Sequence, residues 1–121
     1  MRGLNEDRGH KSAYGYLESL IPSSLGQTRI SVLRLERIEA LLELIGNPHH
    51  AFPSIHIGGT AGKGSACYIL AEILKQAGYK AGLHISPHLE RVNERMQING
   101  VPINDRDFAA LVWWIRPFVK K

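Results

Sequence analysis

Apolar residues recur at helical spacing in several parts of the chain. Within residues 31–45 the apolar residues fall on one face of a helix, which predicts a helix that ends near Gly46 and Pro48. Similar spacing predicts a short helix over residues 12–20, another over 66–77 and a final one that begins after Asn104. Asn104 can cap this last helix, and Pro117 within its pattern should kink or end it.

Short apolar runs at residues 54–57 and 80–85 flank the helix predicted over 66–77. A strand, a helix and a strand in this order predict a right-handed crossover with parallel strands. Residues 94–103 predict a β-hairpin, because Asn99-Gly100 favours a type I′ turn. The expected fold class is α/β: a P-loop-type parallel β-α-β unit with a preceding helical segment, a β-hairpin and a C-terminal helix, forming an incomplete ATPase domain.

The junction between the first strand and its helix is rich in glycine. Glycines reach positive φ and let the backbone approach an anion closely, while the N-terminus of the helix adds partial positive charge. Lys63 adds a full positive charge and is the expected catalytic residue. The pattern predicts a site for nucleotide phosphates made by Gly59, Thr60, Ala61, Gly62, Lys63, Gly64 and Ser65.

Two alternatives remain open for this loop. The strict pattern G-x-x-x-x-G-K-[ST] is not met, because Gly64 stands where the hydroxyl residue belongs and Ser65 comes one position late. A purely structural turn would also use glycines, although it does not explain a lysine between two of them. Thr60 and Ser65 could instead cap the helix through their hydroxyl groups.

Composition narrows the function classes. The 121 residues make one small domain with a net charge of +4 and a single cysteine, Cys67, so no internal disulfide can form. Basic residues are scattered and no apolar run is long enough for a membrane span, so we expect neither nucleic acid nor membrane as a partner. Residues 1–11 are expected to form a disordered tail without a hydrophobic signal core, which favours a cytoplasmic protein.

The loop Gly-Thr-x-Gly-Lys-Gly-Ser resembles that of the Mur ligase superfamily, and within it folylpolyglutamate synthase and its bifunctional relative dihydrofolate synthase. Three further segments carry the resemblance in matching order and spacing, over roughly residues 12–118. They are Ser86-Pro87-His88-Leu89, then Glu94-Arg95-Met96 with Ile98-Asn99-Gly100, and upstream Leu35-Glu36-Arg37-Ile38 closed by Gly46-Asn47-Pro48.

The resemblance implies an ATP-dependent ligase that adds L-glutamate to dihydropteroate or a folate through an acyl phosphate, with ATP and Mg²⁺ bound. Lys63 would stabilise the transferring phosphoryl group. It implies that Ser86 ligates magnesium, although a polar turn before Pro87 is the alternative. The pteroate moiety of the small-molecule substrate would contact Val32, Leu33 and Arg34. His88 and Arg91 would line the substrate side.

The chain also departs from that family. Ala61 stands where asparagine is usual, which removes a side-chain hydrogen bond that shapes the loop, and His84 replaces a usual tyrosine. Residues 1–121 are expected to be the N-terminal portion of the ATP-binding domain. The rest of that domain, further metal ligands, a modified lysine and the C-terminal domain have no place in the chain. These residues alone should therefore be inactive, and the full-length protein monomeric.

Competing functions follow from the same residues. A peptidoglycan Mur ligase fragment would usually carry a hydroxyl residue at position 64, and a P-loop kinase or GTPase would also place one directly after Lys63. A noncatalytic nucleotide-binding remnant is the alternative from another class. The histidines show no zinc-like spacing with cysteine. Glu94 and Arg95 are expected either to form an ion pair or to be ordinary surface charges.

Overall fold

The computed structural model describes residues 9–21 and 35–119. It divides into two compact units. The first unit comprises Met1–Ser54 with Ala109–Lys121, and the second is Ile55–Phe108. The helix α4, Asp105–Val119, begins in the second unit and continues through the first.

The first unit contains the helices α1, His10–Ser19, and α2, Leu35–Leu44, followed by the short 3₁₀-helix η3, Pro48–Ala51. The prediction that the second helix ends at Gly46 is confirmed. Gly46 has φ +84°, and the N–H of Asn47 donates to the Leu42 carbonyl at 2.7 Å. Both residues take the left-handed conformation that commonly ends a helix. Residues 31–34, the start of the predicted helix, lie outside the described residues.

Aromatic side chains join α1 to α4 within the first unit. The rings of Tyr16 and Trp113 lie 5.9 Å apart, and the guanidinium of Arg116 lies 5.1 Å and 5.0 Å from their centroids. Ala13 and Val112 are buried beside them on the same two helices. A cation held against two rings adds electrostatic attraction to apolar burial, so this cluster fastens the two helices together.

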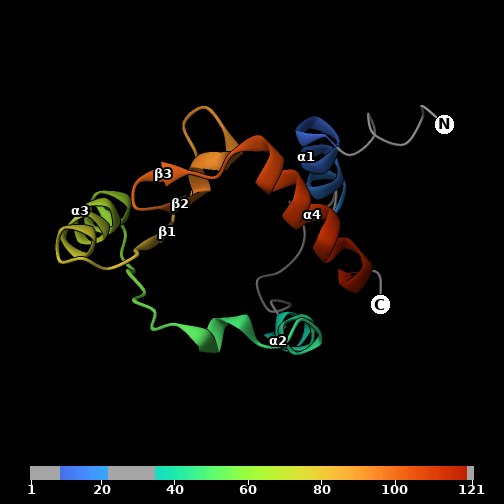
Figure 1. Ribbon diagram of the computed structural model, residues 1–121, viewed down its shortest axis with the longest axis horizontal. Helices are drawn as coiled ribbons and strands as arrows, with labels where there is room; N and C mark the ends of the chain where they lie inside the picture. The colour runs from blue at the N-terminus through green and yellow to red at the C-terminus, as the bar shows by residue number, and fades with distance from the viewer. Residues whose placement is uncertain (1–8, 22–34, 120–121) are drawn as a thin grey trace. The chain divides into compact units, whose positions relative to one another are not determined.

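The second unit holds the helix α3, Lys63–Gln76, and a small sheet against which it packs (Figure 1). The strands are β1, Gly82–His84, β2, Met96–Ile98, and β3, Val101–Pro102, with the 3₁₀-helix η4, Val92–Arg95, before β2. Their order is β1-β2-β3, and Leu83 lies opposite Gln97 in the register. Gln97 is 6% exposed, and its amide donates to the hydroxyl of Tyr68 on α3 at 3.1 Å.

The α/β fold class is confirmed, but the predicted parallel pairing is not found. Both pairings of the sheet are antiparallel, and residues 53–59 form no strand. Ile55 in that segment is 65% exposed. A strand is defined by hydrogen bonds to a neighbour, and the segment finds no such partner among the described residues, so it remains an irregular connection to the loop that follows.

The hairpin prediction is confirmed, because Asn99 and Gly100 both have positive φ, at +50° and +79°. This is the signature of a type I′ turn. Asn99 also bonds Ala81 twice. Its N–H donates to the Ala81 carbonyl at 2.8 Å, and its side-chain oxygen accepts the Ala81 N–H at 2.9 Å. The turn is thereby fixed to the segment that enters β1.

The start of α4 is capped as the sequence predicts. The Asn104 side-chain oxygen accepts the N–H of Asp107 at 2.8 Å. The suggestion that Pro117 ends the helix is wrong, since α4 continues to Val119. Pro117 lies in the last turn, where the removal of one backbone hydrogen bond disturbs the least of the helix.

Replacement of Tyr16 by phenylalanine tests the packing of α1 against α4. The Tyr16 hydroxyl is buried and has no hydrogen-bond partner, which costs free energy of folding. We expect Tyr16→Phe to raise the free energy of unfolding by about 1 kcal/mol in urea titrations, while Tyr16→Ala lowers it because the ring is lost. A clear loss of stability in Tyr16→Phe would contradict this assignment.

Candidate functional site

The glycine loop, residues 58–62, leads into α3 through a left-handed turn. Gly62 is the N-cap of α3 with φ +72°, and Gly59 has φ +145°. The helix begins at Lys63, earlier than the predicted start at residue 66. Lys63, Gly64 and Ser65 therefore form its first turn. Their N–H groups have no acceptor within the helix, and the dipole of α3 adds partial positive charge there.

The ammonium of Lys63 lies back over this loop. Its Nζ donates to the Gly59 carbonyl at 2.5 Å. A Cβ built on Gly59 would lie 3.9 Å from the Lys63 Cγ. A full positive charge, partial charges from N–H groups and glycines with positive φ thus come together at the N-terminus of one helix, an arrangement suited to a polyphosphate.

The capping alternative for Thr60 and Ser65 is wrong, because no side chain caps α3. Both residues are exposed, as is Ala61 between them. Their assignment to nucleotide phosphates stays a prediction, as it does for the rest of the loop. Cys67, one turn further along α3, is half-buried and unpaired, in agreement with a packing role.

Ser86 lies just beyond the C-terminal end of β1, the strand that packs against α3. It is exposed, and its peptide bond to Pro87 is cis, a feature that the sequence analysis did not anticipate. Among residues 9–21 and 35–119, no three His, Cys, Asp or Glu side chains come together to hold a metal ion.

The carboxylate of Glu94 organises the loop that follows Ser86. It accepts the N–H groups of Leu89 at 2.8 Å, Glu90 at 2.9 Å and Arg91 at 2.7 Å. The backbone N–H of Leu89 above all, with those of Arg91 and Glu90, lowers the pKa of Glu94 below its ordinary value of 4.5. Three donors on one carboxylate hold this stretch of backbone in a single conformation.

Arg95 engages the same loop through a side chain. Its Nε donates to His88 Nδ1 at 2.8 Å. The expected alternatives for Glu94 and Arg95, an ion pair with each other or simple surface charge, are both wrong, because each of the two side chains binds the loop instead. His88 and Glu94 are half-buried rather than freely solvated.

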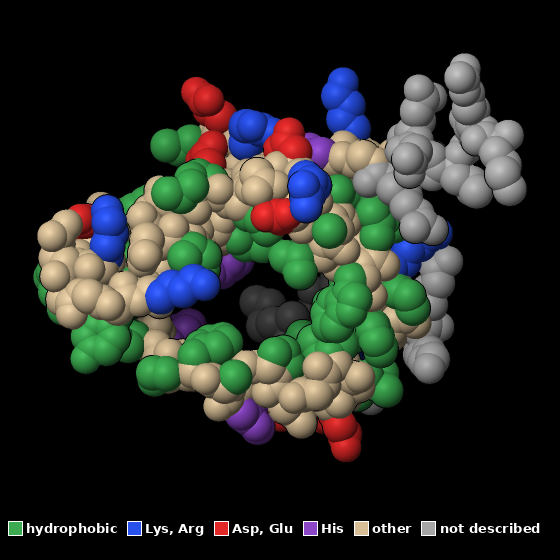
Figure 2. All heavy atoms as spheres, viewed as in Figure 1, with side chains coloured by type: hydrophobic (Ala, Val, Ile, Leu, Met, Phe, Trp, Pro, Cys, Tyr) green, Lys and Arg blue, Asp and Glu red, His purple; other side chains and the backbone are tan. Residues whose placement is uncertain are grey.

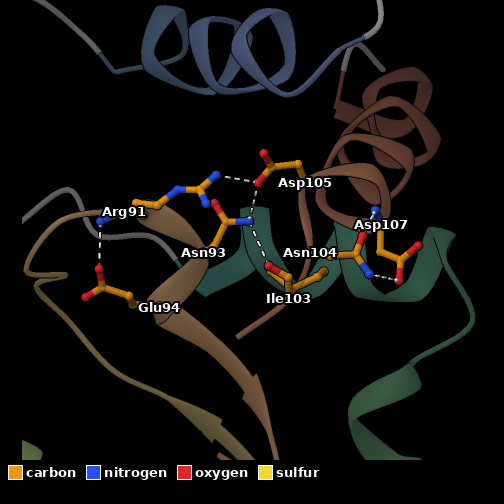
Figure 3. A network of polar contacts seen from close by, with 7 residues as sticks. All are labelled: Arg91, Asn93, Glu94, Ile103, Asn104, Asp105 and Asp107. Carbon is orange, nitrogen blue, oxygen red and sulfur yellow. Dashed lines mark hydrogen bonds and ion pairs between the residues drawn. The ribbon is translucent and has the colours of Figure 1, made fainter. Parts of the chain in front are cut away.

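Arg91 closes a polar network at the start of α4 (Figure 3). Its guanidinium donates to the carboxylate of Asp105 at 2.5 Å, and Asp105 also accepts the Asn93 amide at 3.1 Å. Asn93 is 3% exposed and donates to the Ile103 carbonyl at 2.7 Å. These side chains line an open groove of about 860 Å³ together with Asn104, Arg106 and Asp107. Arg91, which was predicted to line the substrate side, borders this groove, whereas His88 does not line it and contacts Arg95 instead. Their assignment to the substrate side stays a prediction.

The structure does not bring every predicted site residue together. Val32, Leu33 and Arg34 lie outside the described residues, so their assignment is untested. Asn93, Glu94 and Asp105 were missed as site residues. The sequence carried only a weak signal for Glu94, because a capping box expects serine or threonine three residues before the glutamate, where this chain has Arg91. In the structure the Glu94 carboxylate accepts the Arg91 N–H, and the Glu94 N–H donates to the Arg91 carbonyl at 3.0 Å.

Charged side chains of both signs lie on the surface. On the face drawn in Figure 2, lysine and arginine side chains are scattered among acidic and neutral ones. No helix within the described ranges has both the length and the apolar character needed to cross a membrane.

These features describe an α/β protein with a glycine-rich loop at the head of a helix and a polar groove at the start of α4. No model of a known protein family matches the sequence. The chain is nevertheless 37% identical over 86 residues to a dihydrofolate synthase/folylpolyglutamate synthase of Bacillus subtilis. This match covers 71% of the chain and 20% of the relative, so the chain spans about a fifth of the length of that protein.

Solved structures give the same result. A complex of folylpolyglutamate synthase with AMPPCP and folate superposes with a TM-score of 0.80 at 33% identity, covering 93% of this chain and 26% of that one. The Mycobacterium tuberculosis enzyme complexed with ADP and AMPPCP gives 0.76 at 33% identity, over 92% of this chain and 23% of that one. The predicted resemblance to folylpolyglutamate and dihydrofolate synthases is confirmed in both sequence and fold.

The pKa of Glu94 makes its loop contacts sensitive to acid. Because the folded-state pKa lies below the ordinary value of 4.5, the contacts are fully present above that pH. They should be lost as the pH falls through the lowered pKa. NMR titration should show the amide shifts of Leu89, Glu90 and Arg91 moving together in that acid range. Glu94→Gln should abolish this shared transition, and amide shifts that titrate unchanged in the variant would contradict the assignment.

Proposed function

We propose that this chain provides the phosphate loop and part of the substrate surface of an ATP-dependent ligase. The reaction would add L-glutamate to dihydropteroate or a folate, in folate biosynthesis and polyglutamylation. The observation that carries the proposal is Lys63 Nζ lying over the glycine loop at the head of α3. The complexes of related enzymes with ADP, AMPPCP and folate support the same ligand classes.

The proposed reaction gives a role to Lys63, Gly64 and Ser65 at the head of α3. An oxygen of the substrate carboxylate attacks the γ-phosphorus of ATP, which forms an acyl phosphate and releases ADP. The amine of glutamate then attacks the acyl carbon, and phosphate leaves as the amide bond forms. Negative charge shifts over the phosphate oxygens in the first step. Lys63 and the N–H groups of Gly64 and Ser65 would stabilise that charge from fixed positions.

The hydroxyl oxygen that this chain offers at Ser86 is compatible with Mg²⁺, but it would not hold the ion alone. Mg²⁺ prefers oxygen ligands and keeps several waters, with phosphates supplying other positions. Ser86, exposed at the end of β1, would be the protein ligand from this chain. When bound, the ion would neutralise phosphate charge and help to orient the nucleotide.

His88 and Arg91 would face the pterin- or benzoate-bearing substrate. Both lie on the loop that Glu94 and Arg95 hold, and Arg91 borders the groove at the start of α4. Val32, Leu33 and Arg34 would contact the pteroate moiety of the substrate, as the family resemblance implies.

One observation favours a second candidate, a nucleotide-binding role without ligation by these residues alone. The described part of the chain brings together no group of three metal-ligating side chains. It also matches only about a fifth of its Bacillus subtilis relative. Positioning two further substrates and the metal would then need residues beyond those described.

Calorimetry with ATP–Mg²⁺ tests the phosphate loop. We expect Lys63→Ala to weaken binding at least about tenfold, because a charge close to the phosphates is removed. Lys75→Ala is the matched control, since Lys75 lies in the last turn of the same helix and pairs with Glu72 at 3.2 Å. Equal affinities for Lys63→Ala and the unmodified chain would overturn the proposed phosphate site.

A coupled assay of ADP release separates the two candidates. We expect no glutamate-dependent release of ADP from the 121 residues in the presence of ATP, Mg²⁺ and folate or dihydropteroate. The reason is that the described residues bring together no group of three His, Cys, Asp or Glu side chains that could hold the metal. Turnover that is above background and disappears in Lys63→Ala would show that the chain ligates by itself.

A further inference from the structure

We propose that Glu94 and Arg95 are positioning residues that hold residues 88–91 as one preformed surface and present His88 Nε2–H to an acceptor on a folate-type ligand. The inference rests on the proposed function for the identity of that ligand. It adds a means by which the substrate side is organised before the ligand arrives. Neither residue needs to touch the ligand for this role.

The backbone of the loop converges on one side chain. One carboxylate oxygen of Glu94 accepts the Leu89 N–H, and the other accepts those of Glu90 and Arg91. Hydrogen bonds to an ionised acceptor are stronger than neutral ones, and three of them leave these successive peptide units little freedom.

The backbone of Glu94 is itself anchored. Its main-chain carbonyl accepts the amide of the buried Gln97 at 2.8 Å, and Gln97 also bonds Tyr68 on α3. The position of Glu94 is therefore set by the sheet and by the helix that carries Lys63. A loop fixed in this way does not have to be ordered by its ligand, so less conformational entropy is lost on binding.

The contact from Arg95 selects one form of the His88 ring. An arginine Nε can only donate, so His88 Nδ1 must accept and carries no proton. In the neutral ring the proton then resides on Nε2. His88 is thereby a hydrogen-bond donor toward any ligand that reaches Nε2. Its partner must be an acceptor, such as a carboxylate or carbonyl oxygen, and folate carries both.

Arg91 extends the same surface toward the groove. Its N–H is held by Glu94, while its guanidinium is held by Asp105 at the start of α4. The loop is thus tied at its His88 end by Arg95 and at its Arg91 end by Asp105. These separate ties predict that weakening Glu94 loosens the middle of the loop without unfolding the groove.

Imidazole ¹⁵N NMR tests the ring assignment. In the unmodified chain we expect His88 at neutral pH to show an unprotonated Nδ1 and a protonated Nε2. Arg95→Met should shift the signals toward a mixture of tautomers, because the donor to Nδ1 is gone. A protonated Nδ1 in the unmodified chain, or identical spectra for the two proteins, would overturn this part.

Ligand titrations test the positioning of the loop. For Glu94→Gln we expect affinity for folate to fall at least about tenfold, while affinity for ATP–Mg²⁺ stays unchanged. Glu90→Gln is the control, because the Glu90 side chain is exposed on the same loop and only its backbone N–H meets Glu94. Equal losses for both ligands would mean general destabilisation, and no loss for either would mean that the contacts are irrelevant. Both results would overturn the proposal.

Failure of the proposed function would look different. If the unmodified chain binds ATP–Mg²⁺ but not folate, the ligand named here is wrong. The proposal that His88 donates to a folate-type ligand is then overturned. If it binds folate and Lys63→Ala leaves ATP–Mg²⁺ binding intact, the phosphate site fails while the loop proposal stands on the Glu94→Gln result.

Discussion

The left-handed turn at Gly62 is the constraint on which the candidate site depends. With φ at +72°, it lets the chain change direction within one residue and begin α3 at Lys63. A Cβ at this position would meet nothing within 4 Å, so the constraint is conformational rather than steric. An L-residue would still pay about 1–2 kcal/mol for that backbone conformation. The first turn of α3, with its unpaired N–H groups and its lysine, exists where it does because glycine occupies this place.

A continuous set of polar contacts connects that helix to the substrate-side loop. Tyr68 on α3 bonds Gln97 on β2, Gln97 bonds the carbonyl of Glu94, and the Glu94 carboxylate bonds the loop backbone. Gln97 is almost fully buried, so its amide has to be satisfied by these partners. The two halves of the candidate site are thereby connected through β2, although they come from different parts of the sequence.

Local signals in the sequence predicted much of this arrangement. Glycines located the loop and the end of α2, Asn99-Gly100 located the hairpin, and Asn104 located the start of α4. Each works because a single residue type satisfies a local backbone requirement. The parallel pairing of residues 54–57 failed because pairing depends on a distant neighbour, which periodicity cannot supply. The Glu94 and Arg95 contacts were missed for a related reason, since which partner a surface charge selects depends on how the loop folds back.

Asn99 meets two requirements with one side chain. It adopts the left-handed conformation of the turn, and its oxygen accepts the N–H of Ala81 as a main-chain carbonyl would. Glycine would satisfy the first requirement but leave the amide of Ala81, a buried residue, short of an acceptor; most other residues would satisfy neither. Few residue types can therefore replace Asn99, and aspartate is the most similar residue that keeps both properties. A hairpin turn thus limits which amino acids this position accepts for the same conformational reason as Gly62 in the glycine loop, and for the added reason of one side-chain acceptor.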